Sequence, residues 1–248
     1  MQIEAFRTHV ITLGEDILDI MDTYLSHVKE RDIIVITSKI LSVCENCFIE
    51  KDAISKKELI KQEADAVLES DYPNRYGVHL TIKNGFLIPS AGIDESNCQN
   101  GYLVYPKAIQ MSVVRIWEHI RKKYNLKEVG VLLTDSRTTP LRRGITGQGI
   151  GWCGFKPLYN YVGSPDLFGK PLRVSMSNIL DALAASAVLV MGEGKEQTPL
   201  AVIKNAPKIV FLERAPTKEE EDSVIIAMEE DIYAPLLTKA IWKKADKL

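Results

Sequence analysis

Val78-His-Leu-Thr-Ile-Lys-Asn-Gly-Phe-Leu-Ile88 is the stretch that decides the fold class. Two β-like runs, residues 78–83 and 86–88, flank the dipeptide Asn84-Gly85. A two-residue type I′ turn needs positive φ at both central positions, and Asn followed by Gly adopts it at low cost. The stretch therefore predicts an antiparallel hairpin, which does not fit a strict alternation of parallel β-α-β units.

Outward from this hairpin, strands and helices are mixed. Helical periodicity or capping boxes predict helices over residues 15–27, 55–70, 108–124, 177–190 and 217–232, and a final short helix before the lysine-rich tail. Apolar runs predict strands over residues 3–13, 32–37, 129–134, 199–203 and 209–212. The fold class is thus α+β, with mixed, largely antiparallel sheets and packed helices. We expect one unit over residues 1–248, or two intertwined subdomains.

Residues 135–170 are rich in Gly, Pro, Arg and Tyr and show little periodicity. We expect a long loop there, and a loop of that length inside a compact domain is usually functional.

Composition excludes several classes of protein. The formal net charge of −2 gives no support for a partner that is nucleic acid or an anionic membrane. Charged residues interrupt the first sixteen positions, and the longest nearly apolar stretch, residues 182–191, has half the length needed to span a bilayer. We therefore expect a cytoplasmic protein.

The four cysteines include one C-x-x-C pair, Cys44 and Cys47, while Cys98 and Cys153 stand alone. A structural zinc site needs four clustered sulfur or nitrogen ligands, and the histidines are scattered without ligand spacing. A redox pair or half of a zinc site is possible in principle, but ordinary reduced thiols are the simpler interpretation.

Three acidic residues each end an apolar or glycine-rich element: Asp94, Asp135 and Glu193. Such positions are where a scaffold presents ligand-binding groups. Convergent carboxylates without nearby His or Cys suit Mg²⁺ or Mn²⁺. Taken one at a time, each acid could equally be a turn residue or a helix cap.

Positive charge and glycine follow the second of these acids. Arg137, Arg142 and Arg143 precede a run of glycines at 144, 147, 149 and 151, and both arginine forks and glycine-loop amides bind phosphate. A solvated surface turn would also carry arginine.

Residues 192–198 have no P-loop spacing, and residues 149–154 fit G-x-G-x-x-G without the required strand and helix. Residues alone thus indicate an enzyme that binds phosphate and metal.

Five motifs resemble one family, that of coenzyme F-420:γ-glutamyl ligases. They are I-T-S-K-I (36–40), A-G-I-D-E-S-N (91–97), L-L-T-D-S-R (132–137), R-R-G-I-T-G-Q-G-I-G (142–151) and L-V-M-G-E-G (189–194). The resemblance covers most of the chain in order, from about residue 10 to residue 204.

The resemblance implies an α+β homodimer that uses GTP, or ATP, to add L-glutamate to an acceptor. It implies catalytic roles for Asp94, Asp135, Arg142 and Arg143, and Mg²⁺ or Mn²⁺ held by Asp94, Asp135, Ser136 and Glu193, where Ser136 replaces the family's usual Thr. It further implies nucleotide contacts from Ser38, Lys39, Asn97, Gly192, Gly194, Lys195 and Thr198.

The acceptor is less narrowly defined than the chemistry. Residues 154–169 resemble a bacterial branch associated with folate metabolism, so a pterin-type acceptor stands beside the deazaflavin precursor. The chain also lacks a lysine that the family often carries in the segment aligned with residues 42–45, and a glycine in the segment 134–138. Two other classes stay open: a flavin- or deazaflavin-binding oxidoreductase, and a non-catalytic nucleotide-binding regulatory protein.

Overall fold

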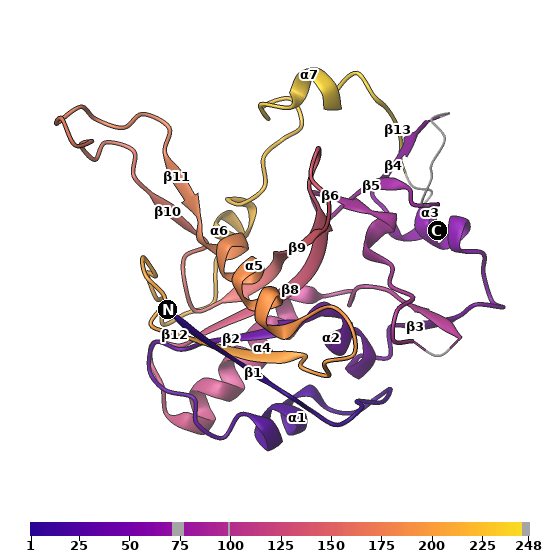
Figure 1. Ribbon diagram of the computed structural model, residues 1–248, viewed down its shortest axis with the longest axis horizontal. Coiled ribbons are helices and arrows are strands. Elements are labelled where there is room, and N and C mark those ends of the chain that lie inside the picture. The colour runs from indigo at the N-terminus through magenta and orange to yellow at the C-terminus, as the bar shows by residue number, and fades with distance from the viewer. Residues whose placement is uncertain (71–76, 99, 245–248) are drawn as a thin grey trace.

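The computed structural model describes residues 1–70, 77–98 and 100–244 (Figure 1). Its centre is a five-stranded sheet in the order β1-β12-β2-β8-β9. The bounds are β1 (Gln2–Phe6), β12 (Leu200–Lys204), β2 (Ile33–Thr37), β8 (Gly130–Thr138) and β9 (Ile145–Cys153). Only β2 and β8 run parallel, and the other neighbours are antiparallel.

Helices cover both faces of this sheet, as the alternation along β2 shows. Ile34 and Ile36 pack in one core with α1 (Ile17–Tyr24) and α4 (Ile109–Tyr124), whereas Ile33 and Val35 pack in a second core with α5 (Ile179–Met191). Because both faces are buried, the strand reads as a continuous apolar run rather than as alternating polar and apolar residues.

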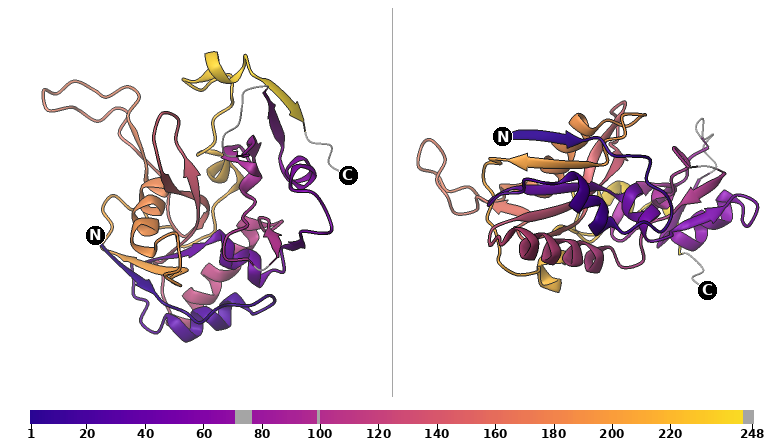
Figure 2. Two further views of the ribbon diagram at one scale, coloured as in Figure 1. Left: turned by 45° about the vertical axis from the view of Figure 1, so that its right-hand side comes forward. Right: turned by 90° about the horizontal axis from the view of Figure 1, so that it is seen from below.

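Beside the sheet lies a smaller group of elements (Figure 2). A four-stranded antiparallel sheet has the order β13-β4-β5-β6, with β4 (Ala66–Glu69), β5 (Leu80–Lys83), β6 (Phe86–Pro89) and β13 (Ile241–Lys244). A two-stranded pair, β3 (Phe48–Glu50) with β7 (Gly101–Leu103), and helix α3 (Lys56–Glu63) complete this group around a third core. The α+β prediction is confirmed.

The hairpin that decided the fold class is β5–β6. Asn84 and Gly85 have φ of 51° and 78°, as the predicted turn requires. The hairpin contributes Ile88 to the core of the central sheet, so it joins the two groups of elements.

The predicted loop over residues 135–170 is wrong in its first half. Strand β8 continues to Thr138, and β9 pairs with it along its whole length, with a register shift after Leu133. The sequence pattern does not predict β9, because several of its positions are glycine and show no alternation of polar and apolar side chains. A Cβ atom on Gly147 would lie 2.4 Å from the Ala184 carbonyl oxygen, and one on Gly151 would lie 2.8 Å from Ile109. These glycines therefore let α5 and α4 approach β9.

Other predicted boundaries also shift. Helix α3 ends at Glu63 because the chain turns into β4, and α6 (Lys218–Asp222) is followed by irregular chain, the short helix α7 (Ala234–Leu237) and strand β13. Residues 209–212 form no strand beyond an isolated bridge between Phe155 and Phe211. Helix α2 (Ser38–Cys44), which follows β2 without a loop, was not predicted.

Two further features matter below. Strands β10 (Leu158–Asn160) and β11 (Met176–Asn178) carry an arm that extends away from the central sheet (Figure 1). Within the part of the chain that the structure describes, no helix has the length and apolar character needed to cross a membrane.

Candidate functional site

A cavity of about 2060 Å³ opens at the carboxyl ends of the parallel strands β2 and β8. Its walls come from the start of α2, the chain after β6, the tips of β8 and β9, and the segment between α5 and β12. Thr37 and Thr134 pair at the last position of the parallel ladder, so Ser38 and Asp135 emerge side by side. Ligands commonly bind at this edge of a sheet.

Every residue that the resemblance assigned to the site lines this cavity. They are Ser38, Lys39, Asp94, Asn97, Asp135, Ser136, Arg142, Arg143, Gly192, Glu193, Gly194, Lys195 and Thr198. Arg137 is different, because it is absent from the cavity lining and forms an ion pair of 3.3 Å with Asp181 at the start of α5. Residues 149–154, which fit G-x-G-x-x-G, belong largely to β9 and carry no dinucleotide-binding turn.

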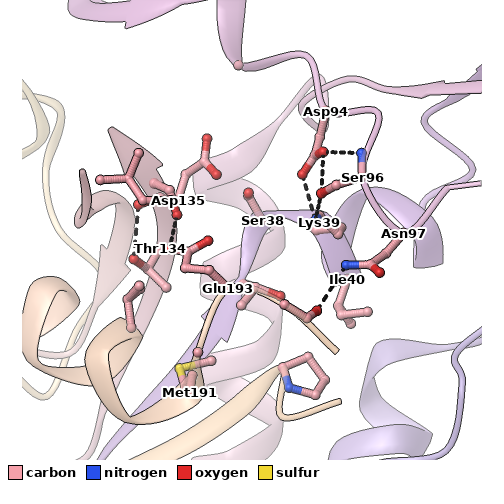
Figure 3. Close-up of a pocket in the computed structure, with 18 of the residues that line it drawn as sticks. Ser38, Lys39, Ile40, Asp94, Ser96, Asn97, Thr134, Asp135, Met191 and Glu193 are labelled. Atoms are coloured by element: carbon pink, nitrogen blue, oxygen red, sulfur yellow. Dashed lines mark hydrogen bonds and ion pairs between the residues drawn. The ribbon is translucent and has the colours of Figure 1, made fainter. Parts of the chain in front are cut away.

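Asp94 lies on one side of the cavity, where Lys39 contacts it (Figure 3). The Lys39 ammonium is 2.7 Å from Asp94 Oδ2 and donates a 2.8 Å hydrogen bond to Ser96 Oγ. Ser96 in turn donates to Asp94 Oδ1 from its backbone amide at 2.6 Å and from its hydroxyl at 2.8 Å. Each oxygen of the carboxylate thus has a hydrogen-bond donor from this chain.

Asp135 lies on the opposite side, with Ser38 and Lys39 between it and Asp94 (Figure 3). Burial raises the pKa of the Asp135 carboxyl above its usual range, and hydrogen bonds from the Tyr105 and Ser38 hydroxyls work against that rise. Burial also raises the pKa of Tyr105, so its O–H remains a donor to Asp135 Oδ2. Sequence reasoning did not find Tyr105, because nothing in its local pattern distinguishes it from a core tyrosine.

A left-handed turn precedes Asp94. Ser90, Ala91 and Gly92 have φ of 49°, 56° and 71°, and two of the three are not glycine. Residues with a Cβ pay a conformational cost in this region, and such strain concentrates at functional sites. At Gly92 a Cβ would lie 2.4 Å from the Tyr105 ring, so the glycine is required for space as well as for φ.

The third acid comes from the segment after α5. Ser136 Oγ donates a 2.5 Å hydrogen bond to Glu193 Oε1, which joins β8 to this segment. The Asn97 side-chain amide donates to the Gly194 carbonyl at 3.2 Å, and the Thr198 hydroxyl donates to the Met191 carbonyl. The predicted nucleotide-binding residues therefore connect both sides of the cavity.

Uncompensated charge is present on both sides. Among the described residues, Asp135 and Glu193 have no cation within ion-pair distance, and Arg142, Arg143 and Lys195 have no carboxylate. The cavity can therefore accept a cation at the acids and an anion, such as phosphate, at the basic groups.

The acids do not form a preassembled metal cluster, since no three His, Cys, Asp or Glu of the described residues stand close enough to hold an ion. The donor set nevertheless fits Mg²⁺ or Mn²⁺. It consists of carboxylates and a hydroxyl, and burial raises the pKa of the Asp135 carboxyl, which has no cation within ion-pair distance among the described residues. Mg²⁺ in particular takes one or two protein carboxylates and fills its remaining positions with water and phosphate oxygens.

No disulfide joins the cysteines of the described residues. All four are free thiols, and burial raises the pKa of Cys44 to about 12 and also raises that of Cys47. A thiol with a raised pKa is mostly protonated near neutral pH, which makes it a weak nucleophile.

Comparisons with known proteins decide the family. The family model described as F420-0:Gamma-glutamyl ligase matches residues 5–205. The chain belongs to this family.

Three of its relatives carry the same name. A coenzyme F420:L-glutamate ligase of Methanococcus maripaludis is 36% identical over 220 residues, which cover 83% of this chain and 86% of the relative. The enzyme of that name from another strain is 34% identical over 249 residues, with 94% and 97% covered. One from Methanocaldococcus jannaschii is 34% identical over 193 residues, with 72% and 77% covered. The predicted enzyme class, a γ-glutamyl ligase, is confirmed at the level of the family.

Proposed function

We propose that this chain is a nucleotide- and divalent-metal-dependent ligase that joins L-glutamate to the terminal carboxylate of an acceptor through a γ-glutamyl amide bond. The observation that carries this proposal is the convergence on one cavity, at the carboxyl ends of β2 and β8, of every residue that the resemblance assigned to the site. Motifs scattered from residue 38 to residue 198 share no local structure, so a common site explains why they occur together.

The chemistry follows from the weakness of a carboxylate as an acyl donor. An acceptor carboxylate oxygen attacks the terminal phosphorus of GTP or ATP, and the nucleoside diphosphate leaves. The amine of L-glutamate, after loss of a proton, attacks the acyl carbon, and inorganic phosphate leaves. Both phosphoryl and acyl transfer develop negative charge on oxygen, so positioned positive charge is the main source of catalysis.

The side chains divide between these tasks. Arg142 and Arg143, at the tip between β8 and β9, are free to bind the transferred phosphoryl group, and Lys195 is free to bind another phosphate oxygen. Asp94, Asp135, Ser136 and Glu193 would hold Mg²⁺ or Mn²⁺, which when bound neutralises phosphate charge. Ser38, Lys39, Asn97 and the segment from Gly192 to Thr198 would surround the nucleotide.

We propose the deazaflavin precursor, coenzyme F420-0, as the first acceptor to test. The relatives named coenzyme F420:L-glutamate ligase support it. The segment 154–169, which suggested a pterin-type acceptor, lies in and before the β10–β11 arm and contributes no residue to the cavity lining. Tetrahydrofolate is therefore the second acceptor. We place the reaction in the cytoplasm, where nucleoside triphosphates are available.

The test is release of inorganic phosphate with Mg²⁺ or Mn²⁺, GTP or ATP, and L-glutamate. Parallel reactions contain the F420 precursor, tetrahydrofolate or no acceptor. We expect phosphate release that requires both glutamate and one acceptor, and a product heavier by one glutamyl unit. Nucleotide binding without turnover for any acceptor would favour a regulatory protein. A purified protein with flavin or deazaflavin absorbance and no bound metal would favour an oxidoreductase.

We also propose a homodimer in which the β10–β11 arm contacts a second copy. Leu167 and Phe168 at the arm's tip are 98% and 94% exposed, and Val174 is 85% exposed. Apolar side chains gathered on a projecting arm are more stable when another protein surface covers them. An arm that extends beyond the body of its own chain reaches a second copy more readily than its own sheet (Figure 1).

A further inference from the structure

Tyr105 contacts Asp135 from the protein interior rather than from the cavity. Its side chain is 5% exposed and does not line the cavity, yet its hydroxyl donates a hydrogen bond to Asp135 Oδ2. The residue follows β7, in the segment that leads to α4, whereas Asp135 belongs to β8. The contact thus connects the smaller group of elements with the central sheet.

Two neighbours fix the tyrosine ring. Gly92, the last residue of the left-handed turn, leaves the space that the ring occupies, and any Cβ there would collide with it. The Lys83 ammonium lies 5.7 Å from the ring centroid, is itself buried, and forms an ion pair with Glu63. The hydroxyl therefore stands at one defined position relative to β8.

We propose that Tyr105 is a positioning residue for Asp135, which sets the orientation of its carboxylate toward the cavity before any ligand binds. A carboxylate on a strand can rotate about two torsions, and a hydrogen bond from a fixed donor to one oxygen restricts both. Groups that orient metal ligands in this way typically contribute about 10–100-fold in metal affinity. The role of Asp135 as a ligand rests on the proposed function; its orientation by Tyr105 does not.

The test compares two buried tyrosines of the same segment. Tyr105→Phe removes the hydroxyl that Asp135 accepts from, and Tyr102→Phe removes one that makes no hydrogen bond within the described part of the chain. We expect the affinity for Mn²⁺, measured calorimetrically without substrates, to fall about 10- to 100-fold in Tyr105→Phe and to change less than about twofold in Tyr102→Phe. Asp135→Asn serves as the reference for loss of the ligand.

Crystal structures of the metal-free wild type and Tyr105→Phe provide a second measurement. We expect the Asp135 carboxylate to leave its wild-type orientation in the variant. An unmoved carboxylate overturns the inference, and so does unchanged Mn²⁺ affinity when Asp135→Asn lowers it. If Asp135→Asn also leaves Mn²⁺ affinity unchanged, the metal role in the proposed function fails, and the crystal structures alone decide whether Tyr105 positions Asp135.

Discussion

The Lys39 ammonium lies 2.7 Å from Asp94 Oδ2 on one side of the cavity, whereas Asp135 and Glu193 have no cationic partner among the described residues. Lys39 lies in the first turn of α2 beside the central sheet, and Asp94 follows the left-handed turn after β6. In the absence of ligand, the lysine therefore supplies the positive charge that a divalent ion would supply at Asp94, and it must give up this contact for Asp94 to bind metal.

This competition predicts that Lys39→Met raises the affinity for metal and lowers the affinity for nucleotide. Without nucleotide, Mn²⁺ should bind about two- to fivefold more tightly, because Asp94 is no longer paired with a cation. GTP should bind about tenfold more weakly, because a charge-assisted hydrogen bond to phosphate is lost. Calorimetric titrations measure both. Lys51→Met is the control, since Lys51 pairs with the neighbouring Glu95 at 3.2 Å. Weaker Mn²⁺ binding by Lys39→Met in the absence of nucleotide would contradict the competition.

Asp135→Asn should lower kcat at least about 100-fold while the fold persists. The amide has the size of the carboxylate, and its carbonyl can still accept the Tyr105 hydrogen bond, but it lacks the negative charge that a metal ligand needs. Phosphate release measures turnover, and thermal melting followed by circular dichroism checks the fold. Wild-type turnover at the same metal concentration would remove Asp135 from the metal site.

Gly147→Ala should lower the free energy of unfolding by about 1–3 kcal/mol, because its Cβ would lie 2.4 Å from the Ala184 carbonyl in α5. Gly194→Ala is the matched control. Its Cβ would meet only the end of the Glu196 side chain, at 3.3 Å, and neither glycine has positive φ. Urea denaturation distinguishes the two. Equal stability of both variants would mean that Gly147 does not serve to admit α5.

The ion pair between Arg214 and Glu220 predicts a stability that depends on pH. Two hydrogen bonds, of 2.6 and 2.8 Å, from the guanidinium lower the pKa of Glu220 to about 2 from an ordinary 4.5. A lowered pKa stabilises the folded state above pH 4.5, and this stabilisation is lost as the pH falls toward 2. Glu220→Gln should cost about 1 kcal/mol at pH 7, since the pair is partly exposed.

The amide oxygen of the glutamine can still accept from the Thr217 backbone in the capping box. Its NH2 group cannot accept from Arg214, so the substitution removes the charge and one of the two guanidinium hydrogen bonds. Denaturation of wild type and variant at pH 7, 5, 4 and 2.5 should show a difference that shrinks as the pH falls. A difference that stays constant over this range would assign the effect to something other than the carboxylate charge.

The exposed apolar side chains of the β10–β11 arm predict that the protein is a dimer. Phe168→Glu should convert a dimer into a monomer, because a charge at the centre of an apolar contact is costly to bury. Light scattering coupled to size-exclusion chromatography measures the mass. Met111→Glu, on an exposed position of α4, is the control because it places the same charge on a residue that is 74% exposed elsewhere on the surface. A Phe168→Glu variant that remains dimeric would exclude the arm from the interface.

Local sequence determined the elements whose signals are local. The Asn84-Gly85 turn, the period of α4 and the Thr217 capping box each depend on residues a few positions apart, and all three occur where they were predicted. The motifs likewise predicted residues that line one cavity, and the phosphate- and metal-binding roles of these residues stay predictions.

The tertiary structure alone decided the rest. Strand β9 has glycines where a strand normally shows alternating side chains, and their purpose becomes visible only once α5 and α4 pack against them. Tyr105 lies 30 positions from Asp135, and only the fold brings its hydroxyl to that carboxylate. Arg137 has the sequence context of a phosphate ligand, yet it pairs with Asp181 in α5. In each case the deciding interaction joins elements distant in sequence, and local propensity carries no information about such contacts.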